Sequence, residues 1–143
     1  MSEQDNTKIA LKFFEGLNSH VPGANRELQS ADYKQESPGA VGMMNTEQAE
    51  AYVQGFIEAF PDLHFDIRHT IAQGDYVVVN WMSSGTHTGG LRTPTGAVIP
   101  PTGKKAMVPG SSTYQFKGGK VTQTWVHWDM TTLLAQLGLM PGM

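Results

Sequence analysis

Two stretches in the N-terminal part of the chain repeat apolar residues at helical spacing. The first starts near Asp5 or Asn6, either of which suits the capping position at the start of a helix. The second starts at Asn45, which with Gln48 suits a capping box, and it ends before Pro61. The apolar positions are Ile9, Leu11, Phe13, Phe14 and Leu17 in the first stretch and Ala49, Tyr52, Val53, Phe56, Ile57 and Phe60 in the second. Both stretches are therefore predicted to be helices with one face on the core.

The residues from Val21 to Met44, between these helices, show no clear period and are broken by prolines and glycines. Only a turn of helix from Arg26 to Gln29 is predicted there.

After the second helix the period of the apolar residues changes from 3.6 to 2, which indicates strands. Apolar and polar residues alternate from Leu63 to Ile71, and Gly74-Asp75 then reads as a hairpin turn. The long strand that follows places Val77, Val79, Trp81, Ser83, Gly85 and His87 on one face. The segment from Gly89 to Gly103 holds several prolines, so a loop at the rim of the sheet is predicted.

Two further strands, at about Lys104–Val108 and Ser111–Lys117, lead through the Gly118-Gly119 turn into a last strand. This strand carries Trp125, His127 and Asp129 on one predicted face and runs into a short apolar helix that stops at Gly138. Helices followed by a run of mainly antiparallel strands predict an α+β fold, with helices packed over one face of a curved sheet that encloses a cavity.

Length and charge narrow the class of protein. The 143 residues fit one domain over 1–143, and the formal charge of −3 gives no basic surface for nucleic acid. The absence of cysteine excludes disulfides and thiolate metal sites. No secretory signal pattern and no apolar run of the ~20 residues needed to span a membrane occur, so a cytoplasmic location is expected.

A set of short motifs, in this order and at this spacing, resembles the SnoaL-like polyketide (ester) cyclases of the nuclear transport factor two-like superfamily. The resemblance spans the chain from the first helix to Gly138. The motifs are Phe60-Pro61-Asp62, Ala72-Gln73-Gly74-Asp75, Gly85-Thr86-His87-Thr88-Gly89, Pro101-Thr102-Gly103-Lys104, Gly119-Lys120-Val121 with Trp125 and Asp129, and Leu133-Leu134 with Gln136-Leu137-Gly138.

The resemblance implies a cone-shaped α+β barrel and a cofactor-free cyclisation. In that reaction, one aspartate near the end of the last strand removes a proton next to a carbonyl and returns one to the aldol oxygen. By motif this aspartate corresponds to Asp129. The chain departs from the family near Asp32-Tyr33, where relatives often carry a histidine and this sequence offers Glu36.

The candidate chemistry centres on Asp129 and His127. A carboxylate that removes such a proton needs a pKa raised toward neutrality, and burial among indoles would raise it. The alternative is that Asp129 caps the C-terminal helix, which would lower its pKa. His127, expected on the same face, would hold the carboxylate or stabilise an enolate, and its alternative is a structural role.

Six further residues are candidate substrate-binding groups. His87 would orient a substrate from a strand end, or else fix the adjoining loop. Thr113 and Gln115 share a face with Ser111 and lie either on the cavity wall or on a solvated outer face. The remaining three are the aromatic residues Trp81, Trp125 and Tyr33, predicted to form a flat apolar wall.

The five histidines are scattered without metal-ligand spacing, and no nucleotide-binding loop or serine elbow occurs, so no metal and no cofactor are predicted. The leading hypothesis is a general acid/base enzyme acting on a hydrophobic carbonyl compound. The alternatives are a non-catalytic small-molecule binding protein and an isomerase, dehydratase or hydroxylase on the same scaffold. A homodimer that pairs through an exposed sheet face is also expected.

Overall fold

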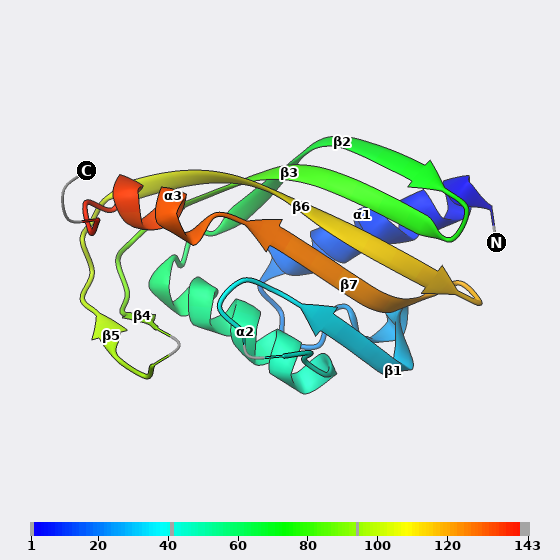
Figure 1. The fold of residues 1–143 in the computed structure, drawn as a ribbon, viewed down its shortest axis with the longest axis horizontal. Coiled ribbons are helices and arrows are strands. Elements are labelled where there is room, and N and C mark those ends of the chain that lie inside the picture. The colour runs from blue at the N-terminus through cyan, green and yellow to red at the C-terminus, as the bar shows by residue number, and fades with distance from the viewer. Residues whose placement is uncertain (1, 41, 94, 141–143) are drawn as a thin grey trace.

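The computed structural model describes residues 2–40, 42–93 and 95–140. Within these residues, helices cover one face of a mixed sheet (Figure 1). The elements are α1 (Glu3–Ser19), the 3₁₀ turn η1 (Arg26–Leu28), β1 (Gln29–Glu36), α2 (Thr46–Ala59), β2 (His64–Gln73), β3 (Tyr76–Thr86), β4 (Leu91–Arg92), β5 (Val98–Ile99), β6 (Lys105–Lys117), β7 (Lys120–Trp128) and α3 (Met130–Gln136).

The main sheet has five strands in the order β1-β7-β6-β3-β2. All neighbours are antiparallel except β1 and β7, which run parallel. Figure 1 shows the long strands curving across the molecule, with α1 behind them and α2 below. The sheet is open, because β1 and β2 are edge strands. The predicted α+β cone with a mixed sheet and a short C-terminal helix is confirmed.

The caps explain where the two long helices begin. Ser2, not Asp5 or Asn6, is the N-cap of α1, and Asp5 accepts bonds from the Ser2 backbone and hydroxyl, which completes a capping box. The predicted capping box of Asn45 and Gln48 is confirmed at the start of α2. None of the described helices is long and apolar enough to cross a membrane.

Two apolar clusters fill the space between helices and sheet. The larger joins α1 to β3, β6 and β7, and Phe13, Phe14 and Tyr114 pack their rings together at its centre. The smaller joins the end of α2 to β6 and α3 through Phe60, Val108 and Leu133. Residues of both clusters line a cavity that lies between the helices and the sheet.

A bulge in β7 decides which of its residues face this interior. Phe116 of β6 pairs with Val121, but its neighbour Gln115 pairs with Gln123, so Thr122 is an extra residue. Val121 and Thr124 are consequently both buried although they are three positions apart. From Thr124 onward, the even-numbered residues of β7 face inward.

Other differences from the sequence prediction concern strands. β1 lies in the region where only a helical turn was predicted; that turn is η1. β6 is a single strand that runs through Pro109 and Gly110, whereas two strands were predicted. Gly110 leaves room for the neighbouring Trp81 ring, because a Cβ there would lie 2.3 Å from it. The predicted rim loop contains the short β4–β5 pair.

Candidate functional site

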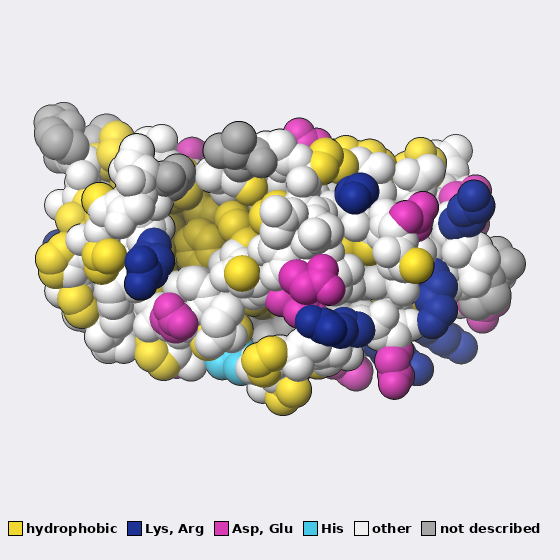
Figure 2. Space-filling model, turned by 90° about the horizontal axis from the view of Figure 1, so that it is seen from below, with side chains coloured by type: hydrophobic (Ala, Val, Ile, Leu, Met, Phe, Trp, Pro, Cys, Tyr) yellow, Lys and Arg dark blue, Asp and Glu magenta, His cyan; other side chains and the backbone are white. Residues whose placement is uncertain are grey.

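A cavity of about 120 Å³ lies between the helices and the concave face of the sheet. It is partly open to solvent, and Figure 2 shows a hollow with a hydrophobic floor on the side of the molecule that carries α2. An apolar cavity of roughly 150 Å³ holds benzene. This cavity is somewhat smaller but partly open, so a ring bound in it would extend into the opening. Its aromatic lining consists of Phe13, Phe14, Tyr52, Phe56, Phe60, Phe65, Trp81, Tyr114 and Trp128.

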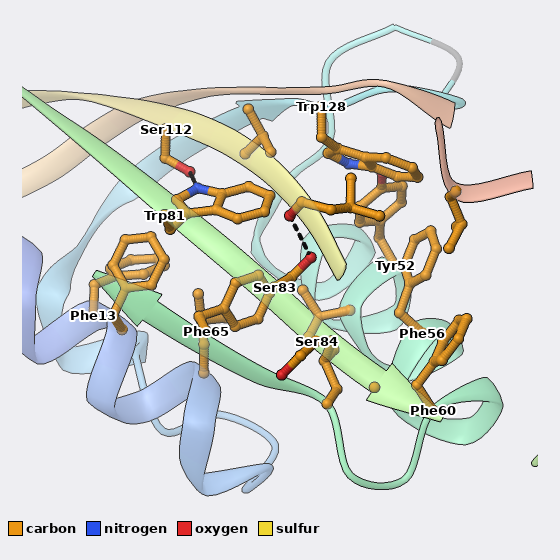
Figure 3. Close-up of a pocket in the computed structure, with 18 of the residues that line it drawn as sticks. Phe13, Tyr52, Phe56, Phe60, Phe65, Trp81, Ser83, Ser84, Ser112 and Trp128 are labelled. Atoms are coloured by element: carbon orange, nitrogen blue, oxygen red, sulfur yellow. Dashed lines mark hydrogen bonds between the residues drawn. The ribbon is translucent and has the colours of Figure 1, made fainter. Parts of the chain in front are cut away.

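These rings pack against one another, which limits their movement. The Trp81 ring meets Phe65 edge-on at 5.1 Å between centroids, and Phe56 meets Trp128 edge-on at 5.4 Å. Trp81 also donates its indole N–H to Ser112 Oγ at 3.0 Å (Figure 3). The wall is therefore formed before a ligand arrives, and little conformational entropy is lost on binding.

A buried polar network lies against one side of the cavity. Tyr33 Oη is 2.7 Å from Gln35 Oε1 and 2.7 Å from Thr124 Oγ1. Because an amide oxygen only accepts and a hydroxyl carries one proton, Tyr33 donates to Gln35 and accepts from Thr124. Gln35 Nε2 in turn donates to Ser37 Oγ at 3.0 Å. Gln35 and Thr124 line the cavity, so the network presents polar groups to a ligand.

Two other polar groups of the lining are already engaged. Ser83 donates to the Val108 carbonyl at 2.8 Å, and Tyr52 donates to the Pro38 carbonyl at 2.6 Å. Burial raises the pKa of Tyr52 to about 12, with a bond from the Trp128 side chain opposing the rise. Tyr52 is therefore protonated at neutral pH and is not a general base there.

None of the described residues that line the cavity is Asp, Glu, His, Lys or Arg. In the same described part of the chain, no three His, Asp or Glu side chains lie close enough to hold a metal ion. The cavity therefore offers apolar contact, hydroxyls and one amide, but no group that titrates near neutral pH.

Asp129 lies outside the cavity and is exposed. It is the N-cap of α3: it accepts the Thr131 N–H and the Thr132 hydroxyl, each at 2.9 Å. These bonds, the Thr132 hydroxyl first, lower the pKa of the carboxyl. The expected rise in the pKa of Asp129 is therefore wrong, and the alternative of a capping role is what the structure shows.

Trp125 and His127 share one face of β7, as predicted, but this face looks outward, because the bulge reverses the alternation; Asp129 lies beyond the end of the strand. Trp125 pairs with Thr113, and His127 pairs with Ser111, on the outer face of the sheet. His127 is exposed, and Trp125 lies beside the half-exposed Tyr76. Thr124, Val126 and Trp128 reach the cavity in their place. A catalytic role for Asp129 and His127 stays a prediction that the geometry does not support.

Thr113 and Gln115 likewise lie on the outer face, whereas Ser112, Tyr114 and Phe116 of the same strand are buried. The cavity-wall position predicted for Thr113 and Gln115 is wrong. Glu36 is exposed, and its neighbour Gln35 faces the cavity instead.

His87 is fully buried at the end of β3, outside the cavity lining. Its Nδ1 accepts the Thr102 N–H at 3.1 Å, and its ring stacks on Phe60 at 5.2 Å. Since Nδ1 accepts, the proton of the neutral ring is on Nε2, which has no partner among the described atoms. Burial lowers the pKa of His87. His87 thus holds the loop before β6 in place through Thr102. This is the structural role predicted as the alternative to orienting a substrate.

Of the predicted substrate-binding residues, Trp81 lies on the cavity wall. Tyr33 lies behind the wall and is hydrogen-bonded to the lining residues Gln35 and Thr124. Sequence reasoning missed Gln35 as a lining residue, because β1 itself was missed. It also left out Trp128 as a lining residue, although Thr124, Val126 and Trp128 form the more apolar of the two faces of β7.

These observations define a class of protein, the open α+β cones that enclose an apolar cavity. The profile of the SnoaL-like polyketide cyclase family matches residues 8–137. The chain belongs to this family. No curated protein matches it.

Solved structures share the fold. AclR, a proposed hydroxylase from Streptomyces galilaeus, superposes with a TM-score of 0.84 at 24% identity, covering 98% of this chain and 89% of AclR. A proposed SnoaL-like polyketide cyclase from Jannaschia sp. CCS1 gives 0.83 at 22% identity, covering 97% and 95%. A proposed polyketide cyclase from Acidithiobacillus ferrooxidans gives 0.74 at 27% identity, covering 96% and 98%.

The capping role of Asp129 predicts different outcomes for two substitutions. Asp129→Asn should keep the bond to the Thr131 N–H and leave the melting temperature nearly unchanged at pH 7, whereas Asp129→Ala should lower it by about 2–4 °C. Because the pKa of Asp129 is lowered in the folded state, the carboxylate stabilises the fold fully above its unfolded-state pKa, and this effect is lost as the pH falls through the lower, folded-state pKa. Thermal melts at pH 7 and pH 3 test this, and equal melting temperatures for both variants at pH 7 would contradict it.

The buried ring of His87 predicts loss of stability in mild acid. Because burial lowers the folded-state pKa, the unfolded chain binds a proton first, and stability falls as the pH drops below the ordinary histidine value of about 6.5. His87→Asn keeps an acceptor near the Thr102 N–H but cannot titrate. It should be less stable at pH 7.5 yet lose less between pH 7.5 and 5.5 than the unmodified protein. Parallel pH profiles from thermal melts would refute the assignment.

Proposed function

We propose that this chain binds a hydrophobic, ring-containing carbonyl compound in the cavity between its helices and sheet, without a cofactor. The observation that carries the proposal is the aromatic lining with Gln35 and Thr124 held against it by a buried network. Mostly apolar walls with a few fixed polar groups are typical of small-molecule sites. Membership of the SnoaL-like polyketide cyclase family supports the same class of ligand.

Family membership also favours a second function, a ring closure, since the family is that of SnoaL-like polyketide cyclases. The resemblance in sequence implies that this closure is an intramolecular aldol reaction. The described lining suits one part of that reaction, the polarisation of the carbonyl, because the Gln35 amide N–H can stabilise an enolate oxygen. The amide does not accept the proton that leaves the carbon next to the carbonyl. The neighbour AclR is a proposed hydroxylase, so the fold alone does not fix the reaction. A cyclised isomer formed from an aryl 1,5-diketone by the unmodified protein, and absent with a blocked cavity, would support this second function.

Filling the cavity should abolish binding. Val126→Phe adds a ring from the inner face of β7, while the matched control Gln123→Phe adds the same ring on the outer face of that strand. Titration with 2-acetylnaphthalene, followed by tryptophan fluorescence or calorimetry, should show affinity reduced about tenfold or more in Val126→Phe only, since lost space removes the apolar contact. Equal affinity in both variants would place the binding site elsewhere.

The outer face of the sheet supports a proposal about assembly. Ile71, Tyr76 and Met107 are 60%, 44% and 50% exposed, and Trp125 lies beside Tyr76. Ile71, Tyr76 and Trp125 lie toward one end of the outer face and Met107 toward the other. Exposed apolar side chains on a sheet face are typical of an interface, and we propose that a second copy of the chain covers this one.

A charge at the centre of that face should separate the two copies. Thr113→Asp would bring two like charges together across a two-fold axis, whereas Ala51→Asp on the exposed side of α2 serves as the matched control. Sedimentation velocity should show dimers for the unmodified chain and the control and monomers for Thr113→Asp. A monomeric unmodified chain at high micromolar concentration would reject the proposal.

A further inference from the structure

A second hollow, of about 60 Å³, lies between the end of α1, the residues that follow it and α2. Its lining is more polar than that of the main cavity. The polar residues around it are His20, Asn25, Gln29, Gln35, Glu50 and Gln54. It also differs in position, because it opens on the helical side of the molecule and no described residue of β3, β6 or β7 lines it.

The two hollows are neighbours that share part of their lining. Phe13, Leu17, Gln35 and Val53 line both of them, so each of these residues has one hollow on either side. Side chains change rotamer far faster than backbone elements rearrange, and a partition made of them opens without unfolding α1 or α2. A ligand longer than the main cavity therefore has a route into the second hollow.

Gln35 is the polar group at this junction. Its Oε1 accepts from Tyr33, and one Nε2 hydrogen is donated to Ser37. An amide nitrogen carries two hydrogens, so the second is free to meet an acceptor on a ligand. Burial and the two existing bonds hold the amide in place, because Gln35 is only 7% exposed. A fixed donor of this kind selects a carbonyl or ether oxygen over a methylene group.

The outer edge of the second hollow is held by a surface ion pair. Arg26 donates from Nε and Nη2 to the two Glu50 oxygens at 2.9 and 2.7 Å, which links η1 to α2. The guanidinium bonds lower the pKa of Glu50. Both side chains are accessible to solvent, so water and salt screen the pair, and its contribution to stability is modest even with two bonds. The edge can therefore part to admit the end of a ligand.

We propose that the two hollows form one binding path for an elongated ligand. An apolar ring lies in the main cavity, an oxygen acceptor meets the free Gln35 N–H at the junction, and a flexible tail extends between α1 and α2. This inference rests on the proposed function, because it assumes that the main cavity holds the ring.

A series of 2-acylnaphthalenes with acyl chains from acetyl to octanoyl tests the path. Affinity for the unmodified protein should rise about three- to fourfold per added methylene as the chain enters the second hollow. Gln54→Trp should fill that hollow and stop the rise while leaving 2-acetylnaphthalene binding intact. Ala51→Trp, on the exposed side of the same helix, is the matched control and should show the full rise.

The outcomes separate the two proposals. If 2-acetylnaphthalene fails to bind the unmodified protein, the proposed function fails. If it binds but Gln54→Trp and Ala51→Trp show the same dependence on chain length, the single path is overturned.

The role of Gln35 is tested by the pair 2-hexanoylnaphthalene and 2-hexylnaphthalene. Gln35→Met should reduce the preference for the ketone about three- to tenfold, since one hydrogen bond is lost. If Gln35→Met does not fold, the same question is answered by a spectrum of the unmodified protein with each compound. The ketone, but not the hydrocarbon, should shift one Gln35 side-chain amide proton in a ¹⁵N-correlated spectrum. Equal shifts with both compounds would exclude the junction donor.

Discussion

The fit of β7 against β6 is the constraint on which the rest of the site depends. One extra residue, Thr122, reverses the alternation of the strand after Val121. Val126 and Trp128 thereby reach the cavity, and His127 turns to the outer face. A strand without the bulge would turn Trp125 and His127 inward and Val126 and Trp128 outward, which would place an imidazole in the apolar interior. Burial of Val126 and Trp128 is the more favourable arrangement, since a buried polar group without a hydrogen-bond partner raises the free energy of the fold.

The same constraint explains why Asp129 is a cap. The strand ends at Trp128, so the next residue lies where α3 begins and where unpaired backbone N–H groups need an acceptor. An exposed carboxylate with two such bonds is stabilised in its charged form. A general base needs the opposite environment. The polar character of the cavity comes instead from neutral groups, a tyrosine hydroxyl and an amide, whose burial costs less than that of a charge.

Much of the fold could be predicted from the sequence, because it depends on local signals. The capping box of Asn45 and Gln48, the period of 3.6 in α2 and the inward face of β3 that carries Trp81 are all visible in the chain. The edge strand β1 could not be predicted, because its alternation is weak and its pairing with β7 is a contact between distant residues. The β7 bulge was missed because Val121 and Trp125 lie on the same face in an unbroken alternation, and the more apolar set after Thr122 belongs to the other face.

These two misses together account for the misplaced site. Without β1, Gln35 had no predicted face, and without the bulge the candidate polar residues of β7 were placed inside. The network of Thr124, Tyr33, Gln35 and Ser37 ties the two missed features together, since it runs from β7 across to the end of β1. Each member forms a hydrogen bond with its neighbour, so burying these polar groups beside an aromatic wall costs little free energy. The network thus holds in place Gln35, which lines both hollows, and the proposed ligand recognition would depend on the parallel β1–β7 edge.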